Sequence, residues 1–182
     1  MATAATTTTK ARAMAEGLDT GLGLVNPGTG VATLLDANTS YQMAERGAAL
    51  PEGVDAGLLD WRDQVQHQVE TTLRWVSWAS EWSIASPSVV RLGCVWTFGG
   101  RYQGDGRYLA DAYMYCVADS VGLGQSFSAT ASFAPTPVET GRHVAQLEAT
   151  IALVHEYCGA PENTYTLDVV VSGDGTGSIR LR

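Results

Sequence analysis

Histidine and cysteine have the greatest capacity for acid–base, nucleophilic or metal chemistry in this sequence, which has three of each. His143 and His155 lie on one predicted helix, more than three turns apart, so they cannot share a metal ion. Cys158 lies near His155 in that helix, with no evident acid to orient the pair. The sequence contains no HExxH and no Gly-x-Ser-x-Gly motif. We therefore predict no catalytic residue, no metal ligand and no cofactor, and we expect the protein not to be an enzyme.

The glycine-rich run from Gly173 to Gly177 invites comparison with phosphate-binding and calcium-binding loops. A phosphate loop needs Gly-Lys-Ser/Thr at the start of a helix, and a calcium loop needs several carboxylates. This run has one aspartate and lies between two alternating apolar segments. The pattern therefore indicates a hairpin turn.

Two groups of side chains are better candidates for contact with a protein partner. Three tryptophans recur at helical spacing near the end of a predicted helix, although an ordinary core helix would use them equally well. Arginine–tyrosine pairs flank a predicted turn, a combination that is enriched at protein interfaces. The candidate contacts are Trp75, Trp78, Trp82, Arg101, Tyr102, Arg107 and Tyr108.

A helix from about Gly57 to Trp82 is predicted to position the tryptophans. Asp55 can cap its first turn. Its apolar residues recur every three or four positions and would form one buried stripe. These residues are Leu58, Trp61, Val65, Val69, Leu73 and Val76.

Two alternating runs, Val90–Phe98 and Tyr108–Val121, predict a hairpin with one apolar face. Folding them about Asp105 places Val95 opposite Tyr115 and Arg91 opposite Asp119. The same register places Cys94 opposite Cys116, which we interpret as two buried thiols rather than a disulfide.

A third strand, a second helix and a second hairpin complete the predicted domain. The strand covers Gln125–Ala134, and its alternation places Phe127, Ala129, Ala131 and Phe133 on one face. The helix covers 136–159, with a capping box at its start, although strand alternation is a rival interpretation of the same residues. The last hairpin folds about Gly175 and places Asp168 opposite Arg182.

The predicted fold class is α+β, with a two-layer antiparallel sheet of about five strands in the order α-β-β-β-α-β-β. Residues 57–182 form one domain, and residues 1–56 form an N-terminal arm that is low in complexity and rich in glycine. The order of elements and the closing run Tyr165–Gly175 loosely resemble small bacterial immunity proteins of the YezG type. No functional residue carries over from that resemblance.

Charge and composition restrict the function. The net charge of −8 argues against nucleic-acid binding, and no apolar run is long enough to span a membrane. Three cysteines without a CxxC pair favour a cytoplasmic location, or a particle assembled in the cytoplasm.

We predict a non-enzymatic, structural or protein–protein interaction role in a larger assembly, for example a phage particle, docked through the N-terminal arm. The expected partner is another protein or a second copy of the chain. Two alternatives stay open. One is an acidic immunity-protein-like or secretion-chaperone-like binder of one basic partner. The other is a small-molecule enzyme with a cleft near the tryptophan-rich helix.

Overall fold

The computed structural model describes residues 23–26, 28, 31–35, 46–79, 84–141, 143–158 and 160–182. These residues form eleven β-strands and one 3-10 turn, Ala56–Leu58, and contain no α-helix. The strands in chain order are β1 (Leu24–Val25), β2 (Val31–Leu35), β3 (Gly47–Pro51), β4 (Val65–Ala79), β5 (Ile84–Tyr102), β6 (Asp105–Ser120), β7 (Gln125–Phe133), β8 (Val138–Thr140), β9 (Val144–Tyr157), β10 (Asn163–Ser172) and β11 (Gly177–Leu181).

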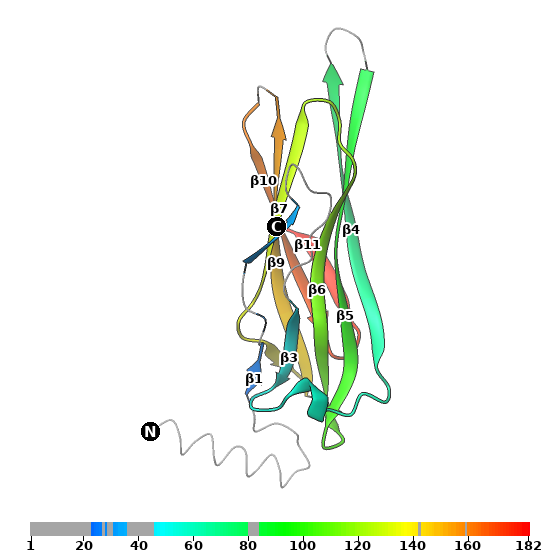
Figure 1. The fold of residues 1–182 in the computed structure, drawn as a ribbon, viewed down its shortest axis with the longest axis vertical. Coiled ribbons are helices and arrows are strands. Elements are labelled where there is room, and N and C mark those ends of the chain that lie inside the picture. Colours follow the sequence, from blue (N-terminus) through cyan, green and yellow to red (C-terminus); the bar gives the residue numbers. More distant parts are fainter. Residues whose placement is uncertain are drawn as a thin grey trace, which may run out of the picture.

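The strands form two antiparallel layers that face each other across one core (Figure 1). The first layer has the order β4-β5-β6-β3-β1. The second has the order β2-β7-β9-β10-β11, and β8 pairs with the start of β9. One parallel bridge between Arg107 and Val144 joins the layers near the starts of β6 and β9, so that pairing connects all eleven strands.

Large inward side chains hold the layers together. Trp96 of β5 is 1% exposed, and its Nε1–H donates to the Ser172 carbonyl of β10 at 3.1 Å. The indole lies against Gly177, where a Cβ atom would be 2.5 Å from Trp96 Cη2. Any larger residue at the start of β11 would therefore push this indole out of place.

The predicted α+β class is wrong, because the segments predicted as helices are strands. Residues 65–79 of the first predicted helix form β4. Val69 and Leu73 recur at a four-residue interval, which fits one face of a helix and equally one face of a strand. In the structure both pack inward from β4, together with Trp75.

The second predicted helix, over 136–159, is replaced by β8, a turn and β9. Leu147, Ile151 and Leu153 point into the core from β9 and are fully buried, as the strand interpretation requires. Glu139, the acidic residue of the predicted capping box, instead contacts the Nδ1 atom of His143 across the turn between β8 and β9.

The first predicted hairpin forms as β5 and β6, but its register is wrong by two residues. Cys94 lies opposite Met114 rather than Cys116. The turn is formed by Gln103-Gly104, with φ values of 55° and 87°, which suit a two-residue type I′ turn. All three cysteines are free, and Cys94 and Cys116 are buried, which confirms the predicted buried thiols.

The last hairpin, β10 with β11, is also two residues out of the predicted register, since Asp168 lies opposite Arg180. The predicted ion pairs still form, but diagonally. Arg182 Nη2 donates to Asp168 Oδ1 at 2.6 Å, and Arg91 Nε donates to Asp119 Oδ2 at 2.6 Å. A two-residue shift keeps every side chain on its own face, and arginine is long enough to reach a diagonal neighbour.

Part of the 1–56 segment belongs to the two-layer domain. β3 pairs with β6, β1 extends that layer, and β2 pairs with β7. Asn26 ties these strands together, because its Oδ1 accepts from Ala48 N–H and its Nδ2 donates to the Ala134 carbonyl. Residues 1–22 and 36–45 of the predicted arm lie outside the described residues.

Candidate functional site

Strand β4 presents the longest open edge among the described strands. It pairs with β5 through fifteen consecutive residues without a register shift, and with no other described strand. Proteins usually protect such an edge with proline, a bulge or several charges, because its N–H and C=O groups can pair with another chain. β4 has no proline and no bulge, and its charged residues are Glu70 and Arg74.

The edge continues beyond the end of the second layer. The β4–β5 pairing extends to Ala79 opposite Ile84, and Figure 1 shows this hairpin projecting past the other strands. The second layer therefore does not cover the end of this hairpin.

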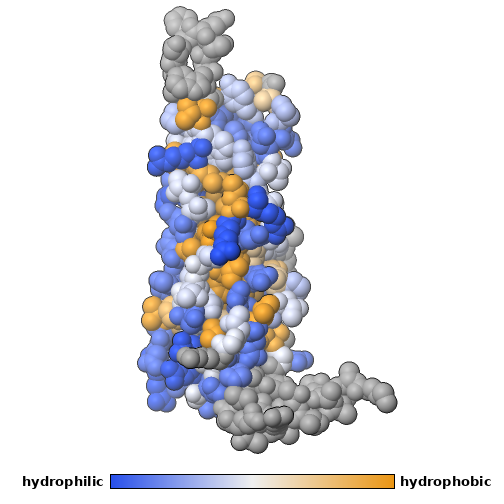
Figure 2. Space-filling model, turned by 180° about the vertical axis from the view of Figure 1, so that it is seen from behind, coloured by the Kyte–Doolittle hydropathy of each residue, from blue (hydrophilic) through white to orange (hydrophobic). Residues whose placement is uncertain are grey.

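The β4 edge lies beside β11, the edge strand of the second layer, without pairing to it in the described structure. Val65 and Val76 of β4 and Leu181 of β11 are 50%, 55% and 56% exposed. On the rear face of the molecule, Figure 2 shows an apolar strip along the long axis, bordered by polar residues. Exposed apolar side chains beside an open strand edge are typical of a protein contact surface.

Two of the three predicted tryptophan contacts lie on β4. Trp75 is half-buried and points inward, where its Nε1–H donates to Tyr165 Oη at 3.0 Å. Trp78 belongs to β4 and lies opposite Ala85 in the register. Trp82 lies outside the described residues.

The predicted arginine–tyrosine cluster is divided between surface and core. Arg101 and Arg107 are exposed and line one polar pocket of about 400 Å³, together with Asp174. Burial acts to raise the pKa of Asp174. Hydrogen bonds, chiefly from Thr176, outweigh this effect and hold the pKa below its ordinary value. Tyr108 is buried.

The partly buried Tyr102 packs against the core. The structure therefore brings the two arginines together, while both tyrosines contribute to the interior.

A charged network crosses the outer face of β4, β5 and β6. Tyr115 Oη–H donates to Glu70 Oε2 at 2.6 Å, and burial together with this bond raises the pKa of Tyr115. Arg91 binds Asp119 with two hydrogen bonds, of 2.6 and 2.8 Å, which lower the pKa of that carboxyl group. This network fixes Glu70 in position at the β4 edge.

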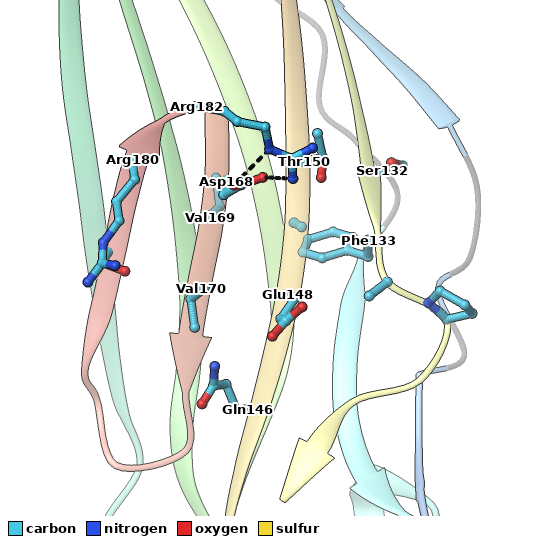
Figure 3. Close-up of a pocket in the computed structure, with 14 residues that line it drawn as sticks. Ser132, Phe133, Gln146, Glu148, Thr150, Asp168, Val169, Val170, Arg180 and Arg182 are labelled. Atoms are coloured by element: carbon cyan, nitrogen blue, oxygen red, sulfur yellow. Dashed lines mark hydrogen bonds and ion pairs between the residues drawn. The ribbon is translucent and has the colours of Figure 1, made fainter. Parts of the chain in front are cut away.

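A groove of about 630 Å³ crosses the outer face of β7, β9, β10 and β11 (Figure 3). Its side chains are mostly polar. Arg182 engages both oxygens of Asp168, at 2.6 and 3.1 Å. The side chains of Glu148 and Arg180 make no hydrogen bond or ion pair within the described structure, so they are available to a polar ligand.

A smaller, more aromatic pocket of about 320 Å³ lies where β4 passes the β9–β10 end of the second layer. Its lining includes Trp75, His155 and Tyr157. The sequence prediction placed His155 on a helix and so did not bring it to Trp75. Alternation along 65–75 and 147–155 was the signal that could have placed both on inward faces.

The described residues contain no group of His, Cys, Asp or Glu side chains that could hold a metal ion. None of their helical segments is long and apolar enough to cross a membrane. Comparison with known proteins finds no matching family model, no matching curated protein and no matching solved structure.

Proposed function

We propose that this protein is a non-enzymatic structural subunit that assembles with further copies of itself through the β4 edge. The observation that carries the proposal is the regular, fifteen-residue β4 strand, paired on one side only within the described structure. An antiparallel β4 strand from a second copy would satisfy its outward N–H and C=O groups. It would also cover the exposed Val65 and Val76 side chains.

The sequence of β4 is complementary to itself in one register. A twofold axis through Thr72 keeps inward residues beside inward residues, and it places Glu70 of each copy opposite Arg74 of the other. If the twofold axis passes through any other position on β4, Glu70 and Arg74 no longer lie opposite each other. The Arg74 side chain has no hydrogen bond or ion pair within the described chain, and the side-chain hydrogen bonds to Glu70 all use Oε2. Glu70 Oε1 is therefore available to an arginine of the second copy.

The assembly would be a larger one, such as a particle built in the cytoplasm. The three free cysteines support a reducing compartment. β2 and β3, from the segment predicted to be a docking arm, already pair within the domain. The β4 edge is therefore better placed than these strands to make the contact.

Sedimentation velocity over a range of protein concentrations tests the proposal. Arg74→Glu creates two Glu–Glu contacts per dimer, and Glu70→Lys creates two Lys–Arg contacts. We expect each variant alone to dissociate at about tenfold higher concentration or more. An equal mixture of the two variants should dimerise again, because both contacts across that heterodimer are then oppositely charged.

The control is Arg62→Glu, which makes the same charge change as Arg74→Glu at a residue that is outside the strands and whose side chain is 88% exposed. It should leave association unchanged. A wild-type protein that stays monomeric would refute the assembly. A mixture that fails to associate, although each variant has lost association, would refute the register about Thr72.

A further inference from the structure

A buried histidine lies at the core end of the aromatic pocket. His155 is 8% exposed, and its ring stacks on Phe127 with 4.6 Å between centroids and an 8° angle between planes. The Trp75 ring lies 5.2 Å away. Trp75 and Phe127 are themselves 4.9 Å apart, so the imidazole and the two aromatic rings form one cluster in which each ring contacts the other two.

A hydrogen-bond network fixes which nitrogen of this ring carries the hydrogen. His155 Nε2 lies 3.0 Å from Gln125 Oε1, which also accepts from Ser88 Oγ at 2.8 Å. Ser88 Oγ accepts from the Gly122 N–H, so its own hydrogen is free to go to Gln125. Because an amide oxygen only accepts, Nε2 must be the protonated nitrogen of the neutral imidazole.

The other nitrogen, Nδ1, consequently carries a lone pair. It has no hydrogen-bond partner in the described structure. Burial lowers the pKa of His155, which favours the neutral ring at neutral pH. A buried acceptor without a donor is unfavourable. A ligand that donates a hydrogen bond to it therefore binds more tightly.

The chemistry of the pocket restricts the ligand. Its volume of about 320 Å³ is at the small end of the range for small-molecule sites. Among the residues that the structure describes, no charged side chain lines the pocket, and its surface combines aromatic, aliphatic and amide groups. The lining residues are Trp75, Val76, Gln125, His155, Tyr157, Ala160 and Asn163.

We propose that this pocket binds a small, uncharged, planar molecule that donates one N–H or O–H hydrogen bond to His155 Nδ1 and stacks on Trp75. Nδ1 is covered by its neighbours in the structure. Binding therefore requires a neighbouring side chain to shift, and Trp75 is the neighbouring ring that also lines the pocket. The site needs no residue from a second copy, although Trp75 and Val76 of its lining belong to the β4 strand that the proposed assembly uses.

Indole and 1-methylindole are matched probes, since they share a flat ring and differ in the donor. Isothermal titration calorimetry of the full chain should show that indole binds and that 1-methylindole binds about tenfold more weakly or worse. In ¹⁵N NMR spectra, the His155 Nδ1 signal should shift with indole and not with 1-methylindole. His155→Phe keeps a flat ring and should abolish the preference for indole, whereas His143→Asn should leave it unchanged.

Three results would overturn the proposal. One is that indole does not bind at millimolar concentration. Another is that both probes bind the wild type equally. The third is that folded His155→Phe keeps the preference. The comparison of the two probes needs only the wild-type protein, so it remains decisive even if His155→Phe fails to fold.

Discussion

Replacing Gly93 by alanine tests the register of β5 with β6. Gly93 lies opposite Tyr115, whose ring lies across it. A Cβ atom at Gly93 would be 2.5 Å from Tyr115 Cζ and 2.7 Å from Cε1, so the tyrosine would have to move. The register predicted from sequence instead places Val95 opposite Tyr115 and leaves Gly93 clear of the ring.

The expected loss of stability follows from these contacts. Moving Tyr115 breaks its 2.6 Å hydrogen bond to the Glu70 carboxylate. A bond to a charged group contributes about 1.5–3 kcal/mol, and overpacking costs about 1–3 kcal/mol. We take the lower values because the ring lies on the outer face of the sheet. Replacing a glycine within a strand by alanine stabilises the folded state by about 0.5–1 kcal/mol, so the net destabilisation is about 2 kcal/mol.

Urea unfolding of four proteins measures this effect: wild type, Gly93→Ala, Tyr115→Ala and the double variant. Without the tyrosine ring, Gly93→Ala should be neutral or slightly stabilising. The coupling between the two sites should therefore be about 2.5 kcal/mol, because the gain from removing the glycine is the same in both backgrounds. An equal effect of Gly93→Ala in both backgrounds would refute the register, as would stabilisation of the wild type.

Three further predictions follow from burial and charge. The thiol of Cys158 should react with a thiol reagent in the folded protein, whereas Cys94 and Cys116 should react only on unfolding, because burial raises the pKa of each to about 12. Burial lowers the pKa of folded His155 below 6.5, so the unfolded chain binds the extra proton first. The free energy of unfolding should therefore fall as the pH drops below about 6.5, and His155→Phe should remove that part of the pH dependence. Asp168→Asn breaks an exposed ion pair and should change the free energy of unfolding by less than about 1 kcal/mol in urea.

The sequence allowed prediction of the faces of the strands, but not of which residues lie opposite one another. Alternation showed that Phe127 and Ala129 share a buried face, and the structure confirms it. The two predicted arginine–carboxylate pairs also formed, although between diagonal rather than opposite neighbours. A register shift of two preserves both features, so neither could reveal the error. Turn geometry decided the register, and the left-handed backbone at Gln103 was not evident from residue type.

The helix predictions failed because a four-residue spacing is a multiple of the strand period. Val69 and Leu73 satisfied both patterns. The intervening Thr71 shares the inward face of β4 with them, which is unusual for a polar residue on a buried strand face. β4 is an edge strand, however, so its inward face is only partly covered and can include polar residues. This error also concealed the β4 edge and the approach of His155 to Trp75, both of which depend on long-range strand packing.

Residue-resolved hydrogen exchange of the β4 amides, measured by NMR at several protein concentrations, tests assembly through this strand most directly. Amides of β4 that bond to β5 should be protected at every concentration. The alternate amides, which point to the open edge, should be protected at high concentration and should exchange rapidly once the protein is diluted to monomer. Rapid exchange of these outward amides in the associated protein would contradict the account.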